Sequence, residues 1–164
     1  MSQPILYCPH CGAHTAQLER FGKLRPVCPT CGYVHFEDPK VAVAVFIRRQ
    51  DEILLVLRAN DPERGKWALP AGYVDRGEDP RAAAEREVLQ ETGLQVQVTR
   101  LIDVIYEGVI VIIYEASVIG GKLCAADDAA EARWFTRQAL PEIAFRSTQQ
   151  VLAAWRDDSA DSAR

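Results

Sequence analysis

Apolar positions from residue 41 onward come in short runs that are separated by charged or small residues. Two of these runs, residues 41–47 and 53–57, flank five polar residues, and this pattern predicts a β-hairpin. Further short apolar runs in the second half of the chain predict additional strands. In all, strands are expected at residues 41–47, 53–57, 96–98, 101–105, 109–118 and 132–135.

Two stretches between and after these runs have the features of helices. Asp79 and Pro80 suit the cap and the first position of a helix over residues 81–92, and Gly93 suits the position after its end. A closing helix is expected at residues 148–156. Strands that flank helices in this order predict an α/β fold, as a mixed α/β or α+β sandwich.

The first part of the chain differs from the rest in composition. Residues 1–38 hold four of the five cysteines and few aliphatic residues. A proline resists continuing regular structure and restricts the residue before it, so the Asp38-Pro39 step is a natural boundary. We therefore expect a small module at residues 1–38 and a second domain at residues 39–164.

The cysteines of the small module form two similar knuckles, each of the form Cys-Pro-x-Cys-Gly. The first contains Cys8 and Cys11, and the second contains Cys28 and Cys31. Four thiolates from two such knuckles complete a tetrahedral shell, which suits Zn²⁺ in a closed structural site. Two disulfides or redox dithiols are the alternatives, and the reducing environment of a cytoplasmic chain favours zinc.

Three further residues near or beyond this module are expected to have no metal role. His10 and His14 lie close to the knuckles but are surplus to a four-coordinate site. Cys124 has no evident partner and is expected to be a buried or half-buried bystander. Because a closed four-sulfur shell has no open position, no catalysis is expected at the zinc.

Composition and charge restrict the classes of protein that the chain can belong to. A hydrophobic content of 48% and a charged content of 26% are typical of a soluble globular protein. No apolar run approaches the ~20 residues that span a bilayer, and the N-terminus lacks a secretory pattern, so a cytoplasmic protein is expected. A net charge of −4 argues against nonspecific binding of nucleic acid.

The stretch around the first helix carries the strongest chemical signal. Gly72 and Gly77 permit a tight loop that leads into a helix, on which Glu87 and Glu91 are four residues apart and share one face. Like charges at this spacing repel unless a divalent cation lies between them. Gln90 is on the same side, and a set of oxygen ligands suits Mg²⁺ or Mn²⁺.

This stretch resembles the Nudix box, whose pattern is Gly-x5-Glu-x7-Arg-Glu-U-x-Glu-Glu-x-Gly-U, with U aliphatic. The matching residues are Gly72, Glu78, Arg86, Glu87, Val88, Glu91, Gly93 and Leu94. Gln90 departs from the pattern, because the family usually has a glutamate there. Glu78 and Arg86 are able to pair and to brace the loop against the helix. The absent charge at Gln90 predicts fewer or weaker metal sites than an intact box would give.

The resemblance extends to residues 67–72 and 131–135 and covers roughly residues 39–156. It implies a Nudix α/β/α sandwich with a mixed sheet, preceded by a zinc ribbon. It also implies a metal ion held by Glu87, Glu91 and the Gly72 carbonyl, and water that attacks a pyrophosphate. Glu87 and Glu131 are both candidates for the base that takes the proton from this water.

A four-cysteine ribbon before a Nudix domain resembles a group of FAD and ADP-ribose pyrophosphatases and, less closely, NADH pyrophosphatases. The resemblance implies Mg²⁺-dependent hydrolysis of a nucleoside diphosphate linked to another group, with release of AMP. A capped RNA end is also left open as a substrate, and a nucleotide-sensing regulator without catalysis is an alternative. Because Nudix relatives commonly pair, a homodimer is expected, with a small dinucleotide-type substrate and no membrane partner.

Several residues of this chain are candidates to hold such a substrate. Aromatic rings offer stacking faces and arginines offer forks for phosphate. The candidates are Trp67, Tyr73, Tyr106 and Phe145 among the aromatics and Arg48, Arg58 and Arg146 among the arginines.

Overall fold

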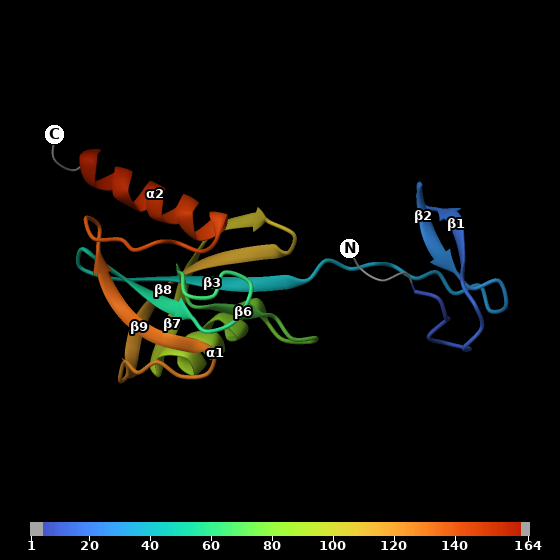
Figure 1. The fold of residues 1–164 in the computed structure, drawn as a ribbon, viewed down its shortest axis with the longest axis horizontal. Helices are drawn as coiled ribbons and strands as arrows, with labels where there is room; N and C mark the ends of the chain where they lie inside the picture. Colours follow the sequence, from blue (N-terminus) through green and yellow to red (C-terminus); the bar gives the residue numbers. More distant parts are fainter. Residues whose placement is uncertain (1–4, 162–164) are drawn as a thin grey trace. The chain divides into compact units, whose positions relative to one another are not determined.

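Two units make up the chain in the computed structural model, which describes residues 5–161. The N-terminal unit is Met1–Asp38 and the C-terminal unit is Pro39–Arg164. Both are drawn in Figure 1, and each is described by itself. Within residues 5–161, neither helix combines the length and the apolar character that crossing a membrane requires.

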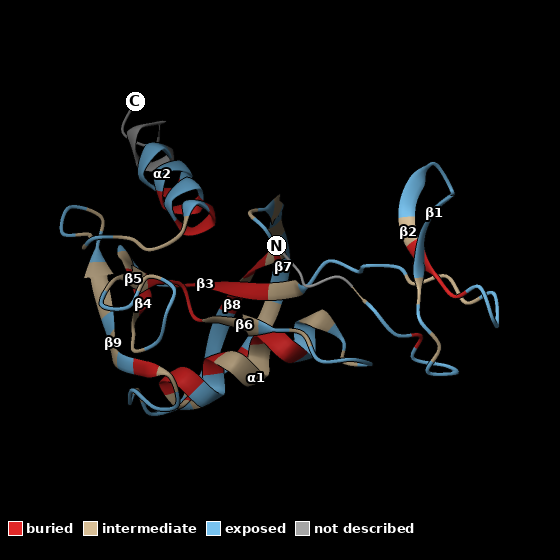
Figure 2. Cartoon of the chain, turned by 45° about the vertical axis from the view of Figure 1, so that its right-hand side comes forward, coloured by how far each residue is buried: buried red, intermediate tan, exposed pale blue. Residues whose placement is uncertain are grey.

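The N-terminal unit is built on a β-hairpin that the apolar pattern did not predict. Strand β1 (Ala16–Arg20) pairs antiparallel with β2 (Lys23–Val27). Isolated bridges join Tyr7 to His14 and Val27 to Val34, and they close the two cysteine-bearing loops. All five residues of β1 are exposed, as its pale blue colour in Figure 2 shows. Among the described residues of this unit, the buried apolar side chains include Cys8, Val27 and Cys28.

A seven-stranded mixed sheet forms the C-terminal unit. Strand β3 lies at its centre, antiparallel to β4 on one side and parallel to β8 on the other, and β7 pairs antiparallel with β8. Strand β6 pairs antiparallel with β3, and β5 and β9 both pair antiparallel with β4. The bounds are β3 Val41–Arg49, β4 Glu52–Arg58, β5 Trp67–Ala68, β6 Ala71–Tyr73, β7 Leu94–Tyr106, β8 Ile110–Gly121 and β9 Ala129–Thr136.

One helix packs on each face of this sheet, because successive side chains of a strand point to opposite faces. On β3, Val43 and Val45 belong to a core with helix α1 (Pro80–Thr92). Ala44 and Phe46, which alternate with them along the strand, belong to a second core with helix α2 (Arg146–Asp161). Figure 1 shows the helices on opposite sides of the strands, so the α/β/α sandwich with a mixed sheet is confirmed.

The ends of α1 are those that the sequence predicted. The Asp79 carboxylate accepts a hydrogen bond from the Arg81 N–H at 2.8 Å, and Pro80 is the first helical residue. Gly93 ends the helix with a φ of 67°, and its N–H donates to the Leu89 carbonyl at 2.9 Å. These caps fix where the acidic face of α1 begins and ends along the chain.

Strand lengths differ from the prediction in one instructive way. The expected strands at 96–98 and 101–105 are parts of one long strand, β7, whose pairing with β8 shifts register at three places. Such bulges interrupt the alternation of apolar and polar side chains without ending the strand. Strands β5 and β6 were not predicted, since two or three residues are too few to show a period.

Candidate functional site

Arg86 on α1 organises the loop and the acidic face of the helix. Its guanidinium makes two hydrogen bonds of 2.8 Å to the two carboxylate oxygens of Glu78, so the expected pair is present and is bidentate. It also donates to Glu87 Oε1 at 2.6 Å, to Gln90 Oε1 at 3.0 Å and to the Tyr73 carbonyl at 3.1 Å. Arg86 holds the pKa of Glu78 down to about 2, which keeps the pair ionised.

Glu87 packs directly against the backbone of Gly72. A Cβ added to Gly72 would overlap the Glu87 carboxylate, so only glycine leaves room for that carboxylate here. Burial raises the pKa of Glu87, the Arg86 guanidinium opposes this shift, and the carboxylates of Asp127 and Asp128 add to it. The loop before α1 therefore forms a cradle for one acidic side chain of the helix.

Glu91 is the most deeply buried of the acidic residues on α1, with 4% of its surface exposed. One of its oxygens accepts a hydrogen bond from the Ala71 N–H at 3.0 Å. Burial, followed by the neighbouring Asp128 carboxylate, raises the pKa of Glu91 to about 9. A carboxyl group in this setting binds a proton readily, and a divalent cation is the other species that offsets its charge.

Asp127 and Asp128 are the acidic residues that sequence reasoning missed. They lie in the loop between β8 and β9, and this loop is tied to the end of α1. The carbonyls of the last two residues of α1 accept hydrogen bonds from the N–H groups of Ala126 and Cys124, at 3.1 and 2.9 Å. The Asp-Asp pair shortly before residues 131–135 was a visible signal, but its proximity to α1 depends on the path of the loop.

The same loop corrects the expectation for Cys124. The side chain was expected to be buried or half-buried, and it is exposed. Its sulfur lies 2.6 Å from the position that a Cβ on Gly93 would occupy. The thiol therefore covers the glycine that ends α1, at the surface of the unit, and does not enter a core.

A cavity of about 550 Å³ adjoins these acidic residues. Gly72 and Asp128 line it, together with three of the candidates for substrate contact, Arg58, Tyr73 and Phe145. The Arg58 guanidinium lies over the Phe145 ring, 4.8 Å from its centroid. A cavity of this size that carries acidic groups and stacking faces is suited to a nucleotide-sized ligand.

The other candidates for substrate contact have different surroundings. Arg48 pairs with a carboxylate on β8 at 3.1 Å. The ring of Trp67 packs edge-on against Phe135, with centroids 4.6 Å apart. Arg146 donates to the backbone carbonyl of Tyr106 at 3.2 Å. These four candidates do not line the cavity that Arg58 and Phe145 line.

Glu131 lies on β9 in a partly exposed position. Its carboxylate accepts a hydrogen bond from Arg133 Nε at 2.9 Å, the kind of surface pair that contributes little to stability. Asp128, three residues earlier, is the residue of this segment that lines the cavity and raises the pKa of Glu91. The structure thus brings Glu87, Glu91 and Asp128 together and pairs Glu131 elsewhere.

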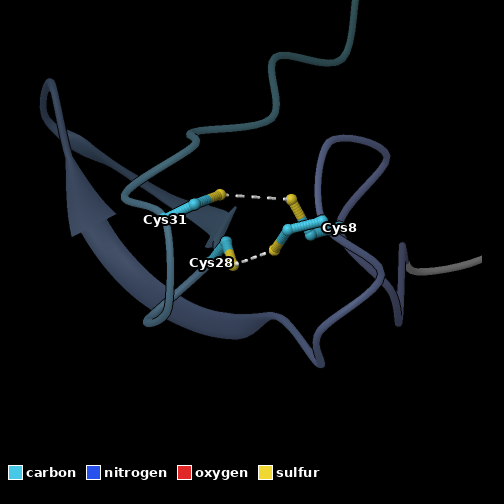
Figure 3. Close-up of side chains that lie close together, drawn as sticks. Cys8, Cys28 and Cys31 are labelled. Atoms are coloured by element: carbon cyan, nitrogen blue, oxygen red, sulfur yellow. Dashed lines mark hydrogen bonds between the residues drawn. The ribbon is translucent and has the colours of Figure 1, made fainter.

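The four cysteines of the N-terminal unit form a second cluster. Their sulfur atoms all lie within 4.8 Å of one another. The Cys8–Cys31 and Cys11–Cys28 sulfurs are 3.6 and 3.5 Å apart, well beyond the ~2.0 Å of a disulfide bond. Figure 3 shows the side chains of Cys8, Cys28 and Cys31 pointing toward one another. This arrangement fits a zinc ribbon and excludes the disulfide alternative in this state of the chain.

The two histidines near this cluster pack against aromatic rings. The ring of His10 stacks on Tyr33 with centroids 4.3 Å apart, and that of His14 packs against Tyr7 at 4.5 Å. Neither belongs to the group of side chains that could hold a metal ion among residues 5–161. They support the two loops from outside the sulfur cluster.

Known proteins similar to this chain share this architecture. A family model described as NUDIX domain matches residues 38–155. An ADP-ribose pyrophosphatase from Methanocaldococcus jannaschii is 42% identical over 120 residues, which are 69% of this chain and 69% of the relative. The crystal structure of a NUDIX hydrolase from Nitrosomonas europaea has a TM-score of 0.86 and 29% identity, covering 94% of this chain and 92% of that one.

One relative also includes the cysteine-bearing segment. The NAD-capped RNA hydrolase NudC from Vibrio vulnificus is 29% identical over 171 residues, which cover 97% of this chain. This chain spans 64% of that relative's length, which is less than two thirds. The likeness therefore extends through both units of this chain but not through the whole of the relative.

Proposed function

The chain belongs to the NUDIX domain family, and on that premise we propose that it hydrolyses the pyrophosphate bond of ADP-ribose, releasing AMP. The gathering of Glu87, Glu91 and Asp128 beside a cavity large enough for a nucleotide carries this proposal. The archaeal relative named as an ADP-ribose pyrophosphatase supports the choice of substrate. FAD, which the sequence favoured equally, is the next candidate.

The residues present fit a divalent metal ion. Burial and the neighbouring Asp128 carboxylate raise the pKa values of Glu87 and Glu91, and the bare backbone of Gly72 faces Glu87. Glu87, Glu91, Asp128 and the Gly72 carbonyl would hold Mg²⁺ or Mn²⁺. Such an ion, when bound, neutralises charge on the phosphoryl group and acidifies the attacking water.

The protein's own groups orient these ligands. Arg86 fixes one oxygen of Glu87, and the Ala71 N–H fixes one oxygen of Glu91, which also lies beside Asp128. Loss of a bond of this kind, made behind a group that binds the metal, typically costs about 10- to 100-fold in metal affinity or activity. Glu78 in turn fixes Arg86 through its bidentate pair.

We favour Glu87 over Glu131 as the carboxylate that accepts the proton from water. Glu87 pairs with Arg86 within the acidic cluster, whereas Glu131 pairs with Arg133 outside it. General bases contribute about 10²- to 10⁴-fold to rate. Glu87→Gln is therefore expected to abolish most turnover, while Glu131→Gln retains it; the opposite result would identify Glu131 as the base.

In the N-terminal unit, Cys8, Cys11, Cys28 and Cys31 are proposed to hold a structural Zn²⁺. A unit with so little buried apolar surface needs the metal to supply its folding free energy. The homodimer and the cytoplasmic location stay predictions.

The experiment that tests the function is release of AMP from ADP-ribose, FAD and NADH, with Mg²⁺ or Mn²⁺. We expect metal-dependent cleavage that Glu91→Gln abolishes and that Glu85→Gln leaves intact. Glu85 is a matched control, since it lies on the same helix and its carboxylate also accepts a backbone N–H, from Val98 at 3.0 Å. No cleavage of any substrate by folded wild-type protein would favour the sensor alternative.

A further inference from the structure

A further set of polar side chains lines the same cavity. Its members lie outside the Nudix box in the sequence. It consists of Glu107, in the turn between β7 and β8, and Ser147 and Thr148, in the first turn of α2. We propose that these residues bind the vicinal hydroxyl groups of a ribose. This inference rests on the proposed function and identifies which part of a nucleotide substrate the cavity reads.

Glu107 is held in place by the start of α2. Its two oxygens accept hydrogen bonds from the Ser147 hydroxyl at 2.7 Å and from the Ser147 N–H at 3.1 Å. Each carboxylate oxygen can accept two hydrogen bonds, so each retains one acceptor position. The carboxylate is thus rigid, already oriented and still able to accept from a ligand in the cavity.

Thr148 supplies a hydroxyl beside this carboxylate. The residue is 2% exposed, and it lines the cavity. Because Thr148 lines the cavity together with Glu107, its hydroxyl is placed to bind a ligand beside that carboxylate.

The surroundings decide which ligand group fits. Val109, Val111 and Leu69 also line the cavity, so the Glu107 charge has apolar neighbours and would repel a phosphate placed beside it. A ribose diol is uncharged. Its hydroxyls donate to the carboxylate, which only accepts, and they pair with the threonine hydroxyl, which donates and accepts. A carboxylate that accepts from a ribose hydroxyl recognises nucleotides in dinucleotide-binding folds by the same chemistry.

The test compares ADP-ribose with its two analogues that lack the 2-hydroxyl of one ribose or the other. Binding is measured by calorimetry without added metal, and hydrolysis is measured in parallel. In wild-type protein, one of the analogues is expected to bind about 10- to 100-fold more weakly than ADP-ribose, as for loss of a hydrogen bond to a charged group. Glu107→Gln and Thr148→Val are expected to reduce this preference several-fold, whereas Glu85→Gln preserves it.

Each outcome bears on one proposal or the other. Glu107→Gln keeps an acceptor for Ser147, and its thermal unfolding shows whether α2 is still packed. Equal binding of all three ligands by wild-type protein, or a preference that both variants retain, would overturn the diol proposal. ADP-ribose that binds with the expected preference but is not hydrolysed with metal would overturn the proposed function alone. Failure of ADP-ribose both to bind without metal and to be hydrolysed with metal would overturn both.

Discussion

The N-terminal unit gathers four sulfurs from two loops that are close in sequence, whereas the C-terminal unit gathers three carboxylates from a helix and a distant loop. The four sulfurs lie close together, but only Cys8 and Cys28 are buried, and little else among the described residues of that unit is. The carboxylates instead lie beside a cavity and are held by a sheet with a core on each face. On the proposed function, the first unit would depend on its metal ion to fold, whereas in the second unit the folded sheet and helix would place the ligands of the metal ion.

Loss of a sulfur ligand should give the largest effect on folding. This effect should be confined to the N-terminal unit. Cys28→Ser removes one thiolate from the proposed zinc site, whose metal would supply folding free energy on the order of 10 kcal/mol. We expect the zinc content to fall and the amide NMR signals of the N-terminal unit to collapse, while the C-terminal unit keeps its thermal transition. Cys124→Ser, at an exposed thiol outside the cluster, is the control. Loss of both units together would contradict the independence of their cores.

The cradle for Glu87 offers the next test. Gly72→Ala places a methyl group where the carboxylate lies, and a displacement of about 1 Å in a catalytic group can cost about 10²-fold in rate. Gly77→Ala in the same loop is the matched control, because its φ of +86° strains the backbone while nothing lies within 4 Å of the added Cβ. We expect turnover to fall for the first variant and stability for the second. Equal loss of turnover in both variants would show that distortion of the loop, and not displacement of the Glu87 carboxylate, lowers the rate.

Acid titration should show how the Arg86–Glu78 pair contributes. The pKa of Glu78 is depressed from 4.5 to about 2, so its stabilising effect is present above pH 4.5 and is lost as pH falls toward 2. The difference in unfolding free energy between wild type and Glu78→Gln should therefore be constant above this window and shrink within it. Urea unfolding at a series of pH values measures this difference. A difference that persisted at the acid end would contradict the assignment.

The smallest expected effect comes from restoring the family's usual residue at position 90. The Gln90 amide oxygen accepts a hydrogen bond from Arg86 at 3.0 Å, and the side chain is exposed. Gln90→Glu adds a charge beside the cluster, and metal affinity follows ligand charge, so Mg²⁺ should bind several-fold more tightly. The Mg²⁺ dependence of AMP release measures this. An unchanged dependence would show that position 90 serves Arg86 alone.

Local signals account for what the sequence predicted correctly. The caps of α1, the cysteine knuckles and the Arg86–Glu78 pair all depend on residues within one or two turns of chain, or on a spacing that the family pattern contains. The central hairpin followed from two short apolar runs that flank polar residues, and the sandwich followed from the order of strands and helices and from the Nudix resemblance. Each of these features is encoded where it occurs, so one sequence suffices to find it.

The features that were missed depend on the path of the chain in space. Asp128 reaches the acidic cluster because its loop is bonded to the end of α1, and Glu107 reaches α2 across forty residues of sequence. Cys124 was expected inside because cysteines often are, yet it covers a glycine at the surface. Periodicity and spacing in the sequence do not predict such contacts, because the residues that meet do not belong to one local motif.

Two hydrogen bonds hold the loop between β8 and β9 against the end of α1, and they report whether the acidic cluster is intact. The N–H groups of Cys124 and Ala126 donate to the last carbonyls of the helix that carries Glu91. Any opening that carries Asp128 away from Glu91 by peeling this loop from the helix must break these two bonds. The rate at which these two amide protons exchange with solvent would then measure how often the site comes apart, in the absence of any substrate.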